Sequence, residues 1–255
     1  MEMMSHIVTP IFNGENYGFW RIKMKTIFQT KKLWEIVEGG GLLYLCASRP
    51  DLMYASSYLS RYMSSPLNKN YQEAKRVLRY VKGTTKFGVQ FERVEEPELH
   101  GYSDSDWGGS VEDKKSTSGY VFTLGSAVFC WNSSKQKTVA QSTAEAEYIA
   151  VCSAANQAIW LQRLVKEIGF NIEEGVKIYC DNKSAIAIAK NPVQHRRTKH
   201  IDIKYHFVRE AEKKRVIKLK YCPGESQVAD IQTKPLSKSR FEDLREKLGV
   251  KMKDF

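Results

Sequence analysis

Six carboxylates after residue 100 of this 255-residue chain lie where the sequence predicts the ends of strands or the first turns of helices. They are Asp104, Asp106, Glu145, Glu147, Asp181 and Asp230. Sites in open α/β sheets form beyond the carboxyl ends of the strands, so these side chains would gather there and repel one another. Divalent cations relieve such repulsion, and Mg²⁺ prefers oxygen ligands. Because two such ions about 3.5–4 Å apart can activate a water and stabilise the leaving oxygen of a phosphodiester, the pattern indicates metal-assisted phosphodiester hydrolysis.

Each acid also has a simpler structural interpretation when it is taken alone. An Asp after a strand is commonly a turn residue or a helix cap, and Glu145 completes an S-x-x-E capping box that starts at Ser142. Helical periodicity does not separate Glu145 from Glu147, because both faces of that helix are apolar. Asp106, two residues after Asp104, competes for the role of first-strand acid. The combined placement of the acids, rather than any one of them, favours a metal site.

The elements that must position these acids begin near residue 99. A strand is followed by a hairpin around Gly125-Ser126 and then by a helix over residues 142–168, which we expect to be buried between layers because nearly all its sides are apolar. Strands and helices then alternate to the end of the chain. This order predicts an α/β fold with a mixed five-stranded sheet, three antiparallel strands followed by two parallel ones, and helices on both faces. A helical N-terminal extension precedes it, with helices over residues 51–63, where Asp51 is the expected N-cap, and 70–82.

Positive charge is concentrated after these elements. The chain carries a net charge of +11, and residues 190–220 alone hold 11 Lys or Arg residues against three acidic ones. A basic balance suits a polyanion or an anionic membrane surface. The segment therefore indicates either a solvated helix face or a surface that binds polyphosphate.

Several classes of protein are disfavoured. The five cysteines are odd in number and form no C-x-x-C motif, which argues against a secreted disulfide framework and against a zinc ribbon. The N-terminus has no apolar signal-peptide core, and the longest apolar stretch, residues 120–131, is far shorter than the ~20 residues of a membrane span. We expect a protein of the cytoplasm or nucleus that is neither secreted nor membrane-bound.

Residues 99–250 closely resemble the ribonuclease H domain at the end of the polyprotein of copia-type LTR retrotransposons, especially those of plants. The matching stretches are GYSDSDWGG, KKSTSGYVFTLG, VAQSTAEAEYIA, YCDNKSAIAIAKNP, RTKHIDIKYHFVRE and VADIQTKPLS. They are long, occur in order and cover about three fifths of the chain. The match is therefore specific.

The N-terminal third resembles two other parts of the same polyprotein. Residues 43–91 are similar to the tail of the reverse transcriptase, and residues 12–39 are similar to the start of the Gag portion. The resemblance implies a Gag-like helical fragment over residues 1–41, a reverse-transcriptase remnant over 42–98 and a ribonuclease H-like domain over 99–255. The sequence has no Y-x-D-D polymerase motif, D-[ST]-G protease motif or zinc knuckle, so it resembles an internally deleted remnant joined near residues 39–42.

The resemblance implies the ribonuclease H fold and a D-E-D-D metal site. Its catalytic and metal-binding residues would be Asp104, Glu147, Asp181 and Asp230, with Mg²⁺ as the cofactor, or Mn²⁺ in its place. Glu147 fits the helix acid because it reproduces the family's E-x-x-A spacing to Ala150. Many members have a His in the loop before the last helix, whereas residues 223–230 contain none, which leaves the efficiency of turnover open.

The implied reaction is cleavage of the RNA strand of RNA–DNA hybrids to 5′-phosphate and 3′-hydroxyl ends. Phosphate contacts would come from four residues of the basic segment, namely Arg196, Arg197, Lys199 and Lys204. The alternative is a catalytically inactive remnant that still binds nucleic acid. A third hypothesis, assembly through the Gag-like fragment, is weaker because so few residues build only a marginal core.

Overall fold

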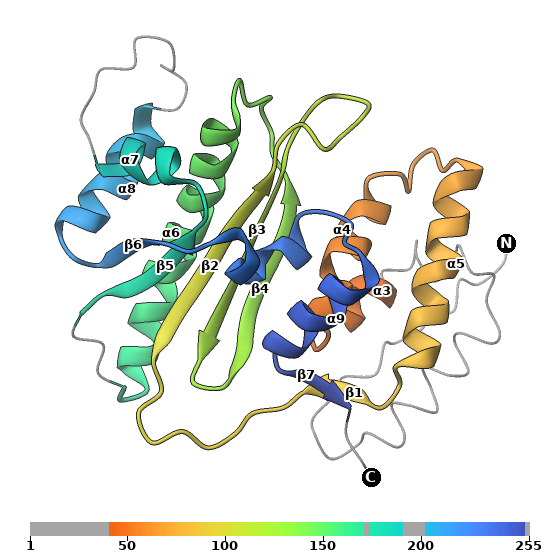
Figure 1. Ribbon diagram of the computed structural model, residues 1–255, viewed down its shortest axis with the longest axis horizontal. Coiled ribbons are helices and arrows are strands. Elements are labelled where there is room, and N and C mark those ends of the chain that lie inside the picture. Colours follow the sequence, from red (N-terminus) through yellow and green to blue (C-terminus); the bar gives the residue numbers. More distant parts are fainter. Residues whose placement is uncertain (1–40, 171–173, 191–201, 253–255) are drawn as a thin grey trace, which may run out of the picture.

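A mixed sheet of five strands is the centre of the computed structural model, which describes residues 41–170, 174–190 and 202–252 (Figure 1). The strands are β2 (Leu99–Asp106), β3 (Thr117–Leu124), β4 (Ala127–Lys135), β5 (Val176–Cys180) and β6 (Ile217–Tyr221). Their spatial order is β4-β3-β2-β5-β6. The first three are antiparallel, and β5 and β6 run parallel to β2. The predicted sheet is therefore confirmed.

Three helices cover one face of this sheet. They are α6 (Thr143–Glu167), α7 (Lys183–Lys190) and α8 (Asp202–Lys213). Alternate residues of the strands, such as Phe122, Ile178 and Ile217, point toward α6 and are fully buried with it. The expectation that α6 is buried between layers is wrong for its C-terminal half, where Trp160 is 56% exposed, because only one side of that half meets the sheet.

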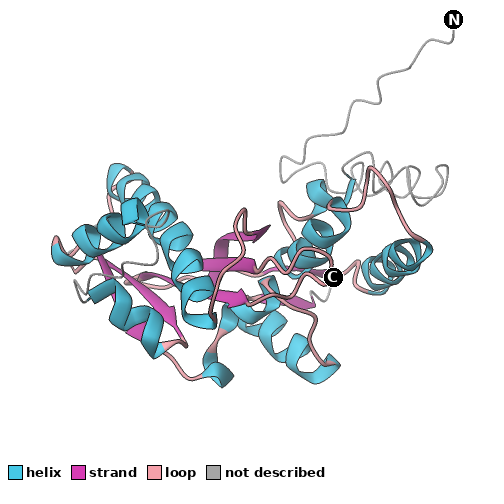
Figure 2. Cartoon of the chain, turned by 90° about the horizontal axis from the view of Figure 1, so that it is seen from above, coloured by secondary structure: helices cyan, strands magenta, loops and turns pink. Residues whose placement is uncertain are grey.

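The C-terminal segment covers part of the opposite face, as Figure 2 shows from above. Its elements are η2 (Gly224–Ser226), η3 (Val228–Gln232), α9 (Lys238–Lys247) and β7 (Val250–Met252). Leu244 and Leu248 pack on Val121 and Val128, so this layer lies over β3 and β4 and reaches β2 through η3. Helices thus lie on both faces of the sheet, as predicted.

The N-terminal extension is helical where it is described. It comprises α3 (Gly41–Leu45), η1 (Pro50–Leu52), α4 (Met53–Ser60), α5 (Asn68–Gly83) and β1 (Phe87–Val89). These elements bury a small core of their own around Leu42, Leu52 and Leu59. Residues 1–40, and with them the expected Gag-like helix, lie outside the described residues. The division at residues 41/42 and 98/99 stays a prediction.

The extension packs against the sheet through specific hydrogen bonds. The indole of Trp131 on β4 donates to the carbonyl of Cys46 at 2.9 Å, and the Gln232 amide donates to the carbonyl of Pro50 at 3.0 Å. In addition, β1 pairs with β7 in an antiparallel ribbon that the sequence did not predict. The ribbon therefore ties the segment that follows α5 to the C-terminal end of the described chain.

Asp51 does not cap a helix, contrary to the prediction. It lies in η1, and its buried carboxylate accepts from Arg49 Nε at 2.9 Å, from Arg49 Nη2 at 2.7 Å and from the Tyr80 hydroxyl at 2.6 Å. The helix α4 begins two residues later, at Met53. A charged donor and a phenol satisfy this carboxylate better than a backbone amide would, because charge-assisted hydrogen bonds are the stronger ones.

Among the helices of the described residues, none combines the length and the apolar run that crossing a membrane would require.

Candidate active site

Asp104 lies near the carboxyl end of β2 and is 1% exposed. Directly opposite it on β3 is Gly119, where an added Cβ would lie 2.5 Å from the Cβ of Gln232. A glycine at this position therefore lets the end of η3 close onto the sheet. As a result the hydroxyl of Thr233 reaches Asp104 and donates a hydrogen bond to its carboxylate.

Glu147 enters the site from the start of α6. The Ser142 hydroxyl caps this helix by accepting from Glu145 N at 3.2 Å, and the carboxylate of Glu145 accepts from Gln141 N at 2.9 Å. Residues two apart on a helix point in nearly opposite directions, so Glu147 turns toward β2 and accepts from Ser105 N at 3.2 Å. The geometry thus separates the two glutamates: Glu145 serves the helix end, and Glu147 faces the sheet.

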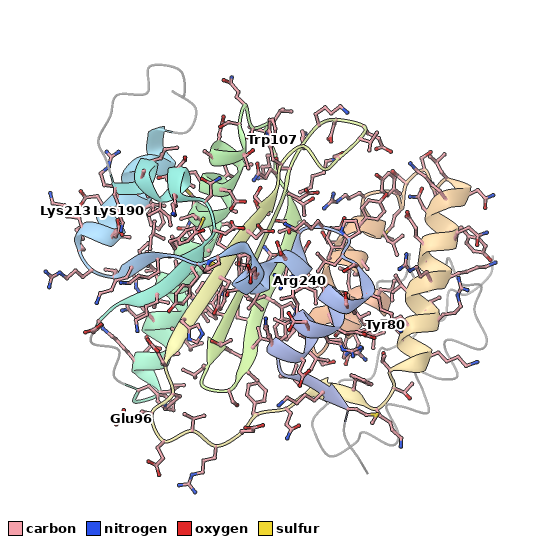
Figure 3. All side chains as sticks on the ribbon, viewed as in Figure 1. Tyr80, Glu96, Trp107, Lys190, Lys213 and Arg240 are labelled. Carbon is pink, nitrogen blue, oxygen red and sulfur yellow. The ribbon has the colours of Figure 1, made fainter. Side chains whose placement is uncertain are left out.

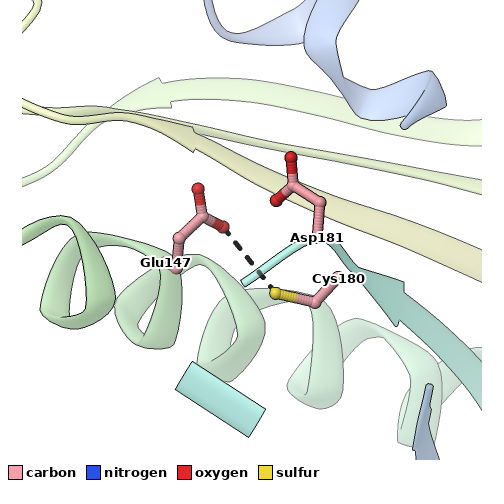
Figure 4. A group of neighbouring side chains, drawn as sticks. All are labelled: Glu147, Cys180 and Asp181. Atoms are coloured by element: carbon pink, nitrogen blue, oxygen red, sulfur yellow. Dashed lines mark hydrogen bonds between the residues drawn. The ribbon is translucent and has the colours of Figure 1, made fainter. Parts of the chain in front are cut away.

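Asp181 follows β5, next in the sheet to β2. Ligand atoms of Glu147, Cys180 and Asp181 all lie within 4.8 Å of one another (Figure 4). The thiol of Cys180 donates to Glu147 Oε2 at a long 3.9 Å. Burial and the nearby carboxylates raise the pKa of Cys180 far above its usual range, so its sulfur is protonated and acts as a weak donor to Glu147.

Asp230 joins the site from η3, and two cations accompany it. Lys234 Nζ lies 2.6 Å from Asp230 Oδ1 and 3.6 Å from Asp104 Oδ2, so it bridges the two carboxylates. Arg240 Nη2 of α9 lies 3.2 Å from Asp230 Oδ2 (Figure 3). Neighbouring carboxylates raise the pKa of Lys234, which keeps the ammonium charged.

The carboxylates perturb one another's ionisation. Burial and the charges of Asp104 and Asp181 raise the pKa of Glu147 to about 9. Burial raises the pKa of Asp104 to about 6, against the lowering effect of Lys234 and Thr233, and Asp230 and Asp181 add to the rise. The pKa of Asp181 is also raised, by burial and by Asp230. These mutual effects place all four predicted acids in one electrostatic cluster.

Asp106 lies beside this cluster rather than in it. Burial raises its pKa, and the charges of Lys234 and Arg61 lower it, without a leading contribution from another acid. Its carboxylate lies instead against the Gly108-Gly109 turn, where a Cβ on Gly109 would meet it at 1.9 Å. Burial and neighbouring acids therefore favour Asp104 over Asp106 as the first-strand acid, and that role stays a prediction.

The donor set fits a hard divalent cation. It consists of carboxylate oxygens that repel one another, and this repulsion raises the carboxyl pKa values. A bound cation would lower those pKa values and favour the charged carboxylates. Asp104, Glu147, Asp181 and Asp230 are the residues that would hold it. Their catalytic and metal-binding roles remain predictions, since the geometry shows proximity and not occupancy.

The predicted phosphate contacts are not placed. Arg196, Arg197 and Lys199 lie outside the described residues, and for Lys204 only the backbone within α8 is described. Conversely, the sequence analysis missed Thr233, Lys234 and Arg240. The four-residue spacing of Asp230 and Lys234 is a typical helical ion-pair signal that could have indicated the lysine, whereas no local pattern links Asp230 to Arg240.

Comparisons with known proteins agree with this architecture. Residues 12–38, outside the described part, match a family model described as a domain of unknown function, DUF4219. The chain is 40% identical over 211 residues to the retrovirus-related Pol polyprotein from transposon RE2 of Arabidopsis thaliana, and 38% identical over 212 residues to that from transposon TNT 1-94 of Nicotiana tabacum. Each match covers 83% of this chain but only 14% and 16% of the respective polyprotein.

Similarity to solved structures concerns the fold alone. A foamy viral protease-reverse transcriptase in complex with double-stranded DNA is similar over 78% of this chain and 34% of that chain, with a TM-score of 0.51 and 14% identity. An RNase H1 in complex with an RNA/DNA hybrid is similar over 53% of this chain and 94% of that chain, with a TM-score of 0.39 and 15% identity.

The strand order and the acids at the strand ends define a ribonuclease H-like domain. Its homologues include retrovirus-related Pol polyproteins of copia-type transposons.

Proposed function

We propose that this protein is a metal-dependent endonuclease that cleaves the RNA strand of RNA–DNA hybrids. One observation carries the proposal: Asp104, Glu147, Asp181 and Asp230 come from four different elements and form one coupled carboxylate cluster at the carboxyl ends of β2 and β5. When bound there, Mg²⁺ or Mn²⁺ would supply an activated water and stabilise the leaving oxygen.

The chain's own residues would orient the carboxylates and bind the phosphates of the substrate. Ser105 N and Thr233 Oγ1 orient Glu147 and Asp104 by hydrogen bonding, so the two carboxylates present fixed oxygens. Lys234 lies at the mouth of the cluster with its side chain 35% exposed, where it can attract a phosphate. The basic segment with Arg196, Arg197, Lys199 and Lys204 would contact backbone phosphates further along the duplex and position it without reading sequence.

A labelled hybrid tests this proposal. Purified protein with Mg²⁺ should cut the RNA strand, and Asp181→Asn should abolish the cleavage because it removes a charged ligand while keeping the shape of the side chain. Glu92→Gln is the control, since Glu92 is an exposed carboxylate whose partner is Lys251 on β7. The absence of Mg²⁺-dependent cleavage, or cleavage that Asp181→Asn leaves unchanged, would refute the proposal.

An inactive remnant that binds hybrids is the second candidate. The observation that favours it is the double neutralisation of Asp230 by Lys234 and Arg240, which lowers the cluster's demand for a second cation. Salt-dependent hybrid binding without turnover in Mg²⁺ or Mn²⁺ would support this candidate.

A further inference from the structure

The uncovered half of the sheet carries an ordered set of aromatic and basic side chains. Strand alternation sends Val176, Ile178 and Cys180 of β5 toward α6, and it sends Lys177 and Tyr179 to the opposite face. The register then places six residues on that face in two rows across three strands: His100, Lys177 and Lys218 in one row, and Tyr102, Tyr179 and Lys220 in the next. We call these six residues the open face.

The outer two strands of the open face lie outside the principal contacts of the C-terminal layer. The helices α6, α7 and α8 contact β5 and β6 from the other side, and the principal sheet contacts of η3 are with β3 and β2. Figure 1 shows β5 and β6 beside the C-terminal layer rather than beneath it. The aromatic and lysine side chains there are partly exposed, and Lys220 is exposed.

The aromatic rings form a single cluster. The rings of Tyr102 and Tyr179 stack with centroids 5.0 Å apart and an interplanar angle of 25°. The ring of His100 stands edge-on to both, with centroids 6.0 Å away. Beside them is a cavity of about 360 Å³, whose lining includes His100, Tyr102, Ser226 and Lys247. A cavity of this size accommodates one flat heteroaromatic ring with its sugar.

The lysines are held by partners that can be displaced. Lys177 pairs with Glu98, and Lys218 Nζ lies 2.9 Å from Glu174 Oε2. The side chains of Glu98 and Glu174 are 58% and 75% exposed, so solvent screens these pairs and an incoming anion can replace the glutamates. Lys220 forms none of the ion pairs found among the described residues.

The open face leads directly to the carboxylate cluster. Asp104 and Asp181 lie two residues beyond Tyr102 and Tyr179 on the same face, which is roughly 7 Å along the strands. Aromatic rings that stack on bases and lysines that contact phosphates are the two parts of a site for unpaired nucleic acid. In a duplex the flat faces of the bases are already covered by their neighbours, so a duplex could use only the lysines.

We propose that the open face binds a single-stranded segment of nucleic acid, with its bases against Tyr102 and Tyr179 and its phosphates on Lys177, Lys218 and Lys220. The segment would run toward Asp104 and Asp181. This binding extends the proposed nuclease function but does not depend on catalysis. It can therefore be measured in EDTA, where its failure and the failure of hybrid cleavage are separate results.

Fluorescence anisotropy of a labelled twelve-residue oligothymidine with the full chain is the test. Tyr179→Leu should weaken binding about tenfold, because one base–aromatic stack contributes about 1–3 kcal/mol, whereas Tyr179→Phe keeps the ring and should bind as the wild type does. An abasic oligomer of the same length has no bases to stack, so it should bind Tyr179→Leu and the wild type with the same affinity.

Charge variants give a second and independent readout. The double variant Lys218→Ala/Lys220→Ala should lower the slope of log affinity against log salt by about 1.4, which is about 0.7 for each lost phosphate contact. Glu174→Gln should act in the opposite direction and tighten binding, because it removes the competing carboxylate. Lys251→Ala, which removes an exposed lysine paired with Glu92 outside the basic segment, is the control and should change little.

Two results would overturn the proposal. Wild-type affinity of both Tyr179→Leu and the double lysine variant would show that oligothymidine binds elsewhere, such as the segment of residues 190–215. If Tyr179→Leu weakened the binding of a duplex of the same length as much as it weakens the binding of oligothymidine, the open face would not select unpaired bases. Thermal melting of each variant shows whether its fold is intact, and the double variant Lys218→Ala/Lys220→Ala keeps the test decisive if Tyr179→Leu fails to fold.

Discussion

Replacing Lys234 by Met tests whether this ammonium group stands where a divalent cation would bind. In the metal-free protein Lys234 bridges Asp104 and Asp230 at 3.6 Å and 2.6 Å, so it already neutralises part of the cluster. A cation that binds between these carboxylates must displace the ammonium group or share them with it. The variant Lys234→Met keeps the length of the side chain and removes its charge, and we therefore expect it to bind Mn²⁺ more tightly than the wild type does.

The distances set the size of this effect. Two unit charges 4 Å apart attract by about 4 kcal/mol at the effective dielectric constant of a protein surface and by about 1 kcal/mol in bulk water. The Lys234 side chain is 35% exposed, so the lower part of this range applies. A competition of about 1.4 kcal/mol corresponds to a tenfold lower Kd for Mn²⁺ in the variant.

Electron paramagnetic resonance of free Mn²⁺ measures this Kd without any need for activity. Lys251→Met, which removes an exposed ion pair with Glu92 on β7, is the matched control and should leave the Kd unchanged. The metal-free variant should also melt at a lower temperature than the wild type, and Mg²⁺ should raise that temperature more than it does in the wild type. An unchanged or weaker Mn²⁺ affinity in Lys234→Met would refute the reasoning.

Three further predictions concern pH, backbone approach and the N-terminal extension. Folding raises the pKa of Glu147 to about 9, so above pH ~4.5 the folded state binds more protons than the unfolded state. The melting temperature in EDTA should therefore fall as pH rises toward 9. The variant Glu147→Gln should show a smaller fall. Gly119→Ala should lower the free energy of unfolding by about 1–3 kcal/mol, as measured by urea denaturation, because its Cβ would meet Gln232 at 2.5 Å; a neutral result would show that η3 adjusts freely. Arg49→Ala should lower the free energy of unfolding by about 3–5 kcal/mol in the same assay, because it leaves the buried carboxylate of Asp51 without its guanidinium partner. The control Lys82→Ala, at an exposed position of α5, should lower it by less than about 0.5 kcal/mol.

The sequence was sufficient for the order of strands and helices along the chain and for the acids at the strand ends. The Gly125-Ser126 turn and the strand-like segments beside it define β3 and β4, since turns and short strands are local features. That the strands ending at Asp104 and Asp181 are neighbours is a property of the folded sheet, which local reasoning did not predict. Local reasoning also failed for Asp51, which it predicted to be a helix N-cap. The Tyr80 hydroxyl that donates to Asp51 lies 29 residues away, and no local signal indicates such a contact.

Tertiary structure alone decided which side chains share the site. Glu145 and Glu147 have equal claims in the sequence, and only the packing of α6 on the sheet turns Glu147 toward Ser105 and leaves Glu145 at the helix end. Lys234 and Arg240 become part of the cluster because η3 and α9 fold back over β2 and β3. The physical reason is that periodicity reports which face of an element is apolar, whereas the balance of charges at one point depends on elements that meet only when the chain is folded.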